Sequence, residues 1–306
     1  NDEYNQLTTI SDYRLTMANN YKAFNENLSY YSIKKLYTNW IRLFYKSGVS
    51  LSYSTVLPSI FSITFMILFI YFILYKELKN IYLSLIIVSI ILSLGQLTEI
   101  ATLSTPDALS SFLLLLIAFS YLYKRHNAII LLLMVLSVLT RTDNIIWCSF
   151  LIVSDFISNY RLQKLISNGI ALIILLIVYL GLNSTANNGG WWVVFYNTFI
   201  DRVNYPLTET PNFEFLDYLK TIIKRSYLFI NGFLIILMFL YLHRYSILNM
   251  KLTRELVIIM VCIFTFIARF SLFPVNWDRF NFILLLIPIL IIIIENKQFL
   301  TSYKKH

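Results

Sequence analysis

The chain has 306 residues, of which only 13% are charged and 58% are apolar. Soluble globular proteins carry about 25% charged residues, so this composition excludes an ordinary soluble domain and indicates an integral membrane protein. Lys and Arg outnumber Asp and Glu by 25 to 16. These cations form no dense basic cluster, so we interpret the excess as a signal of membrane topology and expect no nucleic-acid partner.

Residues 1 to 55 form the first polar segment. They contain neither a signal peptide nor a run long enough to cross a bilayer, and the chain does not begin with Met. We therefore predict a further membrane helix upstream; the alternative is a native outside N-terminus with a trimmed start. Between about residues 30 and 47, apolar side chains recur at helical spacing, which predicts an interfacial helix that packs on the membrane surface or borders an entrance for a lipid substrate.

Apolar runs suited to membrane crossing follow this segment. A helix needs about 20 apolar residues to cross the hydrocarbon core, and fewer when it is partly buried in a bundle. About nine runs fit, which predicts an all-α, polytopic membrane bundle forming one domain over residues 1–306. The three short runs between residues 108 and 156 are typical of broken or tilted helices that line a cavity. In chain order the runs are 56–75, 81–95, 108–123, 128–140, 145–156, 165–182, 227–242, 256–270 and 280–294.

A second long polar segment covers residues 183–226. It begins with Asn187-Asn188-Gly189-Gly190 and contains two prolines, which predicts a flexible turn followed by irregular structure. A separate soluble domain is excluded because the segment is too short to bury a core of its own. Trp191 and Trp192 are interpreted as anchors at the lipid headgroups, with stacking on a sugar ring as the alternative.

Loop charges predict the orientation. One alternate set of loops holds twelve of the cations and only four acids, whereas the other set, with both long polar segments, is nearly balanced. Cytoplasmic loops are the basic ones in membrane proteins. We therefore place the C-terminus in the cytoplasm and expect residues 1–55, 96–107, 141–144, 183–226 and 271–279 outside.

The cysteines and histidines do not predict a metal site. Cys148 and Cys262 lie inside apolar runs, where we expect them to be core residues. His126, His243 and His306 are isolated along the chain, whereas a metal site needs several ligands at close spacing. No metal ligands are therefore assigned.

Charged residues near the outer ends of the apolar runs are the candidates for chemistry, because ionisable groups at membrane depth are costly. They combine carboxylates, which can accept a proton, with arginines, which can stabilise a departing phosphate. We predict that the loops bring them to one face. The outward set is Asp2, Glu3, Asp12, Glu99, Asp107, Arg141, Asp143, Arg269, Asp278 and Arg279.

Three strings carry most of these residues, and each has a purely structural alternative. In residues 104–109, Pro106-Asp107 opens a run and would suit a helix start. In residues 139–144, Arg141 and Asp143 could simply pair at the membrane interface. In residues 269–280, an outward turn has an arginine near each end, and these could snorkel beside an aromatic belt.

The strings together resemble those of polytopic GT-C type glycosyltransferases. Members of that family are helical membrane proteins that transfer a sugar from a polyprenyl-phosphate carrier on the outer face. Their catalytic carboxylate usually lies in the first outer loop, commonly in an acidic pair followed by an aromatic residue, and Asp2-Glu3-Tyr4 matches this pattern. The resemblance therefore implies Asp2 and Glu3 as catalytic carboxylates, with Asp12 as a fallback. Thr142 is a departure, since many relatives carry Pro or Glu there.

The resemblance implies an inverting transfer to a glycan or lipid acceptor. Asp2 or Glu3 would deprotonate the acceptor hydroxyl, and attack would occur opposite the leaving carrier phosphate. No cofactor is assigned, and a divalent cation stays open. The residues expected to bind the carrier phosphate or substrate are Asp107, Arg141, Asp143, Arg269, Asp278 and Arg279.

Three other classes of function fit the same charges. One is a non-catalytic membrane assembly subunit, in which single changes of a carboxylate or an arginine would leave function intact. A polysaccharide polymerase of the O-antigen type would use residues 183–226 as its active region. A transporter or flippase for lipid-linked sugars would line its pathway with these side chains, although the chain shows no repeated pair of broken helices. The richness in Ile, Asn, Lys and Tyr is typical of bacterial cell-envelope proteins, which predicts a place in the bacterial inner membrane among membrane lipids.

Overall fold

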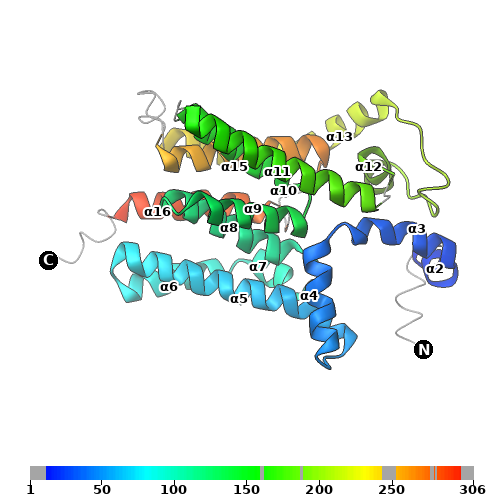
Figure 1. Cartoon of the computed structure of the whole chain (residues 1–306), viewed down its shortest axis with the longest axis horizontal. Coiled ribbons are helices and arrows are strands. Elements are labelled where there is room, and N and C mark those ends of the chain that lie inside the picture. The colour runs from blue at the N-terminus through cyan, green and yellow to red at the C-terminus, as the bar shows by residue number, and fades with distance from the viewer. Residues whose placement is uncertain are drawn as a thin grey trace.

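The computed structural model describes residues 12–158, 162–186, 189–242, 253–275, 279 and 281–297. Every regular element in these ranges is a helix, so the all-α prediction is confirmed for the described chain (Figure 1). The helices are α2 (Asp12–Asn19), α3 (Tyr21–Ser32), α4 (Lys35–Lys46), α5 (Leu51–Leu78), α6 (Ile81–Leu92), α7 (Gly95–Thr102), α8 (Asp107–Leu122), α9 (Asn127–Thr140), α10 (Asn144–Ser158), α11 (Leu162–Ala186), α12 (Trp191–Phe199), α13 (Phe215–Leu242), α15 (Arg254–Leu272) and α16 (Phe282–Glu295).

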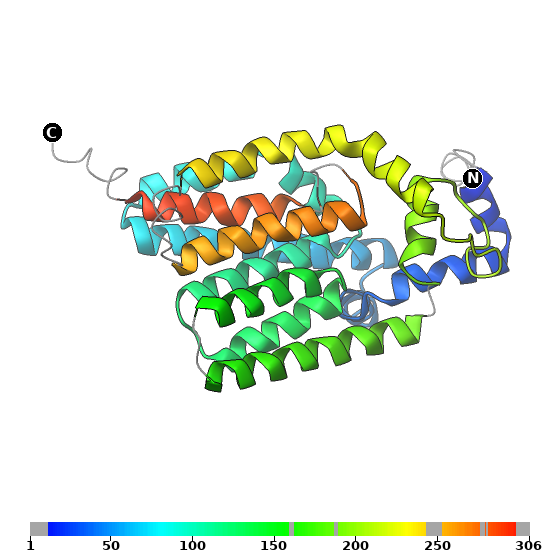
Figure 2. The ribbon, with the colours of Figure 1, turned by 90° about the horizontal axis from the view of Figure 1, so that it is seen from above.

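The long helices lie side by side in one bundle. Helices α5, α8, α9, α10, α11, α15 and α16 run roughly along the same axis in both ribbon views, and α2, α3, α4 and α12 gather at one end (Figures 1 and 2). Helices α8, α9, α10 and α11 alternate in direction along the chain, and α16 runs opposite to α15 (Figures 1 and 2). We call the end where α8, α10 and α16 begin the site end, and the opposite end, where α9, α11 and α15 begin, the basic end.

Among the residues that the structure describes, three helices are long and apolar enough to cross a membrane, namely α5, α11 and α15. Helices α6 and α7 make a fourth candidate if they count as one span, although they meet at a bend of 66°. Apolar helices of this kind indicate a membrane protein.

The prediction of about nine crossings is not confirmed. All nine predicted runs fall on helices, but α8, α9, α10 and α16 have only 14 to 16 residues. At 1.5 Å per residue such helices reach about 24 Å at most, less than the roughly 30 Å hydrocarbon core. They are nevertheless built into the centre of the bundle, since α8 packs against α5 and α9, and α10 packs against α15.

The core lies between these short helices and the longer ones. Its largest fully buried side chains include Trp147 of α10, Phe119 of α8 and Met66 of α5. Both cysteines belong to this core, with Cys148 0% and Cys262 1% exposed. Their prediction as core residues is confirmed, and the surrounding apolar packing explains why a thiol can be accommodated there.

The described part of the first polar segment contains three short helices, α2, α3 and α4, where a single interfacial helix was predicted. Helix α3 ends at Ser32 and α4 begins at Lys35, so the predicted helix over about 30–47 is broken near Lys34. Helix α4 packs against α5 and α9, and the hydroxyl of Tyr37 donates to the Thr55 carbonyl at 2.7 Å. The segment is therefore attached to the bundle by its buried face.

The second polar segment is more regular than predicted, because α11 extends to Ala186, α12 follows the glycines and α13 begins at Phe215. Its aromatic residues pack on one another: the Trp192 ring lies 4.5 Å from that of Phe213 and stacks on Phe195 at 5.5 Å. The indole nitrogen of Trp192 donates to the Asn212 carbonyl at 3.0 Å. Composition does not predict these contacts, and they order the segment.

Buried polar contacts join the two polar segments. The carboxylate of Glu26 on α3 accepts hydrogen bonds from the backbone amides of Leu207 and Thr208, at 2.9 and 3.1 Å, and from the Thr208 hydroxyl. The Asn27 amide donates to the Asn204 carbonyl at 3.1 Å. Residues 201–214 are thereby held against α3 at the site end of the bundle.

Candidate functional site

The first component of the site is Asp107, the first residue of α8. Its side chain is 3% exposed, and it accepts a hydrogen bond from the Thr105 hydroxyl at 2.8 Å. The preceding turn is fixed to α5, because the Ser59 hydroxyl donates to the carbonyls of Leu103 and Thr105. A carboxylate in the first turn also interacts favourably with the helix dipole. Asp107 therefore starts a helix, as the structural alternative for this string predicts, and it also occupies a buried position next to charged residues.

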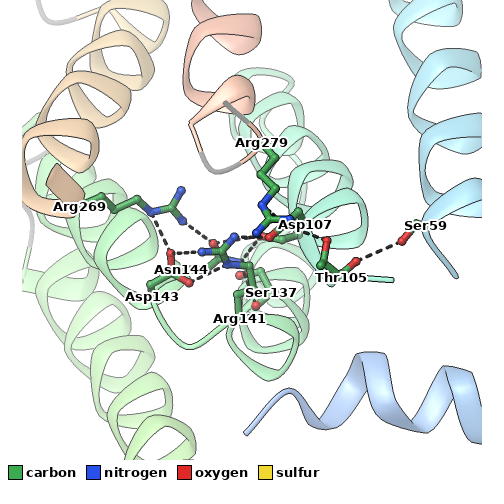
Figure 3. Close-up of polar contacts among 10 residues, drawn as sticks. Ser59, Thr105, Asp107, Ser137, Arg141, Asp143, Asn144, Arg269 and Arg279 are labelled. Carbon is green, nitrogen blue, oxygen red and sulfur yellow. Dashed lines mark hydrogen bonds and ion pairs between the residues drawn. The ribbon is translucent and has the colours of Figure 1, made fainter. Parts of the chain in front are cut away.

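The second component is the turn between α9 and α10. Arg141 follows the last residue of α9, and its guanidinium grips Asp143 through two hydrogen bonds of 2.9 and 3.0 Å. The same guanidinium contacts Asp107 through Nη1. Arg141 therefore bridges two carboxylates, whereas the sequence alternative had only a local pair with Asp143 (Figure 3).

The third component is Arg269 in the last turn of α15. Its Nε atom lies 3.2 Å from Asp143, and Nη2 donates to the Asn144 side chain at 2.7 Å. Asn144 is fully buried and donates in turn to the Ser137 carbonyl at 2.9 Å and the Ser110 hydroxyl at 2.8 Å. This amide connects α8, α9, α10 and α15 at one point.

Arg279, in the segment that leads to α16, completes the cluster. Its Nε atom lies 3.6 Å from the second carboxylate oxygen of Asp107. Figure 3 shows Arg279, Arg141 and Arg269 approaching the carboxylates from three different elements. With three guanidiniums and two carboxylates, the cluster carries a net positive charge.

Three helix N-termini point to the same place. Helices α8, α10 and α16 begin at Asp107, Asn144 and Phe282, which all lie at the site end. Helix N-termini carry partial positive charge and unpaired backbone amides, so they attract anions. The backbone therefore adds to the positive potential of the arginines.

A cavity of about 730 Å³ opens beside the cluster. Its floor includes Asp107, Asp143 and the three arginines, and its opposite wall comes from α3, α12 and the segment after α12. Lys34 and Arg202 also line it, which makes five cations against two carboxylates. Pockets of about 300–1,000 Å³ are typical for small-molecule ligands.

The wall of the cavity opposite the cluster is polar as well. Tyr30 of α3 accepts a hydrogen bond from the Asn197 amide of α12 at 3.1 Å. The side-chain amide oxygen of Asn197 accepts a hydrogen bond from the backbone amide of Val203 at 2.8 Å. Both side chains line the cavity, so the contact that joins the two polar segments also offers hydroxyl and amide groups to a bound molecule.

The charges of the turn residues are strongly coupled. Burial acts to raise the pKa of Asp143, but the neighbouring guanidiniums of Arg141 and Arg269 outweigh it and bring the pKa to about 2. Burial acts to lower the pKa of Arg141, yet the two carboxylates raise it above its ordinary value. Both groups therefore stay ionised at neutral pH, and Asp143 is a weak base. Burial, followed by the charge of Arg141, lowers the pKa of Lys34.

The structure brings together five of the residues predicted to bind carrier phosphate or substrate. Asp107, Arg141, Asp143, Arg269 and Arg279 share ion pairs and line one cavity. Asp2, Glu3 and Asp278 lie outside the described residues. Asp12 begins α2 and Glu99 lies in α7, and neither lines the described part of the cavity.

The sequence interpretation missed several residues of this site. Lys34 lies inside the interfacial helix predicted over about 30–47, but in the structure it lines the cavity at the break between α3 and α4. Asn144 follows Asp143 at the start of an apolar run, a position that could have marked it as a helix-start residue. Tyr30, Asn197 and Arg202 carried no local signal, because only the docking of the two polar segments brings them here.

Among the described residues, no group of three or more His, Cys, Asp or Glu side chains lies close enough together to hold a metal ion. Comparisons with protein families, with curated proteins and with solved structures find no match for this chain. The site is therefore characterised by its own geometry: a deep cationic cavity with two carboxylates at the end of an apolar helix bundle.

Proposed function

We propose that this protein is a membrane glycosyltransferase that uses a sugar donor linked to a polyprenyl phosphate. The observation that carries the proposal is the cavity at the site end, where five cations face two carboxylates inside an apolar, membrane-type bundle. A phosphate monoester or diester is the natural anion for such a cluster, because planar guanidiniums bind phosphate oxygens well. A sugar requires hydroxyl and amide partners, which Tyr30 and Asn197 offer.

The cations divide into two groups by their surroundings. Arg141 and Arg269 are 16% and 8% exposed and are held by Asp143, so they set the potential of the cavity floor. Arg279 is 31% exposed and lies at the junction with α16. In the proposed reaction Arg279 contacts the carrier phosphate directly, and the other two arginines stabilise its charge through space.

The proposed transfer is inverting. The acceptor oxygen forms a bond to the anomeric carbon while the bond from that carbon to the phosphate oxygen breaks, and the phosphate leaves with the electron pair. The acceptor proton passes to a carboxylate, for which Asp2 or Glu3 remains our proposal. Asp143 is a poor choice because its pKa of about 2 makes it a weak proton acceptor.

The test uses the full-length protein in proteoliposomes with a panel of polyprenyl-phosphate sugars. Carrier-phosphate release and sugar transfer are measured for the wild type, Asp2→Asn and Arg279→Gln. Loss of a positioned base typically costs about 100-fold to 10,000-fold in rate, so we expect Asp2→Asn to fall in that range. Loss of the phosphate contact should lower the rate by about 100-fold.

Arg42→Gln is the matched control for Arg279→Gln. Arg42 is an exposed arginine of α4 that does not line the described cavity, so its removal should leave transfer unchanged. If the wild type releases phosphate from none of the donors but moves lipid-linked sugar between leaflets, the transporter alternative replaces the enzyme. If Arg279→Gln and Arg42→Gln behave alike, the assignment of the phosphate contact is wrong.

A further inference from the structure

A second cavity, of about 340 Å³, lies at the basic end of the bundle. Its mouth carries four cations, Lys124, Arg125, Lys164 and Arg254, and one carboxylate, Asp155. These residues come from the α8–α9 turn and from helices α10, α11 and α15. The cavity is on the other side of the bundle from the candidate active site and shares none of its lining residues.

The single carboxylate is already engaged. Asp155 is 6% exposed and pairs with Lys164 at 2.8 Å, and it also accepts hydrogen bonds from Tyr121 and Asn168 at 3.2 and 3.3 Å. It therefore neutralises one cation of the four. The Arg254 guanidinium donates to the Tyr121 carbonyl at 2.7 Å, which orients this cation, and it forms no ion pair with a carboxylate among the residues that the structure describes.

Lys124 and Arg125 add two charges at the rim. Both are exposed, and their side chains make no hydrogen bond or ion pair with any described residue. The left-handed backbone of Lys124, with φ of 54°, lets the chain reverse between α8 and α9. As a result both cations sit immediately beside the first turn of α9.

Backbone groups reinforce this charge. Helix α9 begins at Asn127, α11 at Leu162 and α15 at Arg254, so three helix N-termini are directed at the basic end. The first residues of α9, Asn127 and Ala128, line the cavity themselves. The mouth of this cavity therefore suits an anion on two independent grounds, side-chain charge and helix dipoles.

Most of the remaining wall is apolar, although Ser167 and Asn168 of α11 also line it. It consists of side chains from α9, α10 and α11, among them Ile130, Met134, Leu151 and Ile170. Helix α11 is one of the candidate spans, and only 11% of its apolar window is buried, so this side of the cavity is open toward the bundle surface. A ligand that fits must be anionic at one end and apolar along its length.

We propose that this cavity binds an anionic phospholipid, with the headgroup phosphate between Lys124, Arg125 and Arg254 and an acyl chain along α9 and α11. Basic pockets between membrane helices are suited to anionic lipid headgroups. A soluble phosphate would use the mouth but gain nothing from the apolar wall. The proposal does not depend on the reaction proposed for the opposite end.

The experiment reconstitutes the full chain in phosphatidylcholine vesicles that contain a trace of spin-labelled phosphatidylglycerol. Electron paramagnetic resonance measures the motionally restricted fraction, from which an association constant relative to spin-labelled phosphatidylcholine follows. Each cation near a membrane surface contributes about fivefold to the association of an anionic lipid. We expect Lys124→Gln to lower the preference about fivefold and the pair Lys124→Gln with Arg125→Gln to remove most of it.

Lys79→Gln is the matched control. Lys79 directly follows α5 at the same end of the bundle, is exposed and has the same left-handed backbone, with φ of 49°, but it does not line the cavity. We expect less than a twofold change. An equal loss in Lys79→Gln and Lys124→Gln would overturn the site in favour of diffuse surface charge, and so would a wild type without preference for phosphatidylglycerol.

A competition arm identifies the source of the phosphate. Soluble glycerol phosphate at millimolar concentration should leave the restricted fraction of labelled phosphatidylglycerol unchanged. Displacement by this soluble ligand would show that the cavity takes a small anion and would overturn the lipid assignment. Thermal unfolding of each variant in detergent is compared with the wild type, and Arg125→Gln alone provides the same test if Lys124→Gln unfolds.

Discussion

The two ends of the bundle stabilise buried charges through different arrangements of ion pairs. At the basic end two carboxylates form separate pairs, Glu77 with Lys297 and Asp155 with Lys164, at 2.9 and 2.8 Å. At the site end Asp107 and Asp143 share three arginines in one connected cluster (Figure 3). The basic-end lysines are 46% and 30% exposed, whereas Arg269 is 8% exposed.

The difference shows how charge can be kept inside an apolar bundle. An ion pair whose cation reaches solvent needs no further partners, and it contributes little to the free energy of unfolding. A charge that is cut off from solvent must be neutralised by several fixed partners, because burial of an unpaired ion is strongly destabilising. The site-end cluster provides those partners and keeps an excess of positive charge facing the cavity.

The largest expected difference between the ends is their accessibility from the two sides of the membrane. The positive-inside rule predicts that the site end faces outward. In intact cells, a membrane-impermeant thiol reagent should label Thr210→Cys fully and Asn127→Cys only after permeabilisation. Cys148 and Cys262 are buried, so they give no background. The reverse labelling pattern would contradict both the orientation and the outward-facing site.

Removal of Asp107 should produce the largest loss of stability. Asp107→Ala leaves Arg141 and Arg279 without a shared carboxylate in a buried position, and breaking such a pair costs about 3–5 kcal/mol. The free energy of unfolding in mixed detergent and sodium dodecyl sulfate micelles measures it. Asp155→Ala is the comparison at the basic end, where the freed Lys164 can turn to solvent, so about 1–2 kcal/mol is expected. Equal losses would refute the contrast.

Acid should weaken the site end through Asp143. Its pKa in the folded protein is about 2, below the ordinary value of 3.8, so the ionised carboxylate stabilises the folded state. That stabilisation is fully present above about pH 4 and is lost as the pH falls through about 2, and it amounts to about 2 kcal/mol. Unfolding free energies of the wild type and Asp143→Asn should therefore converge as the pH is lowered. A difference that stays constant over this range would rule out the low pKa.

The smallest effect is expected for an exposed pair at the basic end. Lys297→Gln removes the partner of Glu77, but Lys297 is 46% exposed and Glu77 keeps a 3.0 Å hydrogen bond from Tyr123. Exposed ion pairs contribute about 0.2–1 kcal/mol, so the unfolding free energy should change by less than about 1 kcal/mol. A loss as large as that of Asp155→Ala would mean that this pair is more shielded than its exposure indicates.

The positions of the helices could be predicted from the sequence to a large extent. Each apolar run became a helix because a continuous apolar stretch satisfies its backbone groups internally in an apolar environment. The number of membrane crossings could not be predicted, since composition does not distinguish a short helix that faces lipid from one such as α8 that is enclosed by its neighbours. The break near Lys34 was also missed, because helical spacing continues across it.

Candidate site residues could be chosen one by one, but their contacts could not. Charge near the end of an apolar run was enough to select Arg141 and Arg269. Arg141 lies 34 residues from Asp107, and Arg269 lies 125 residues from Asn144, so no local pattern links them. Their functional role stays a prediction that the transfer assay tests.

The sequence by itself determined that this is an all-helical, membrane-type protein with scarce charges at the ends of its apolar runs. That follows from the cost of placing charge and unpaired backbone in an apolar phase. Only the tertiary structure decided which charges meet, because α15 packs against α8, α10 and α16, which run in the opposite direction, and this packing joins distant segments at the site end. It also decided that α3 and residues 201–214 pack together beside the site-end cavity, through buried hydrogen bonds whose partners are more than 170 residues apart.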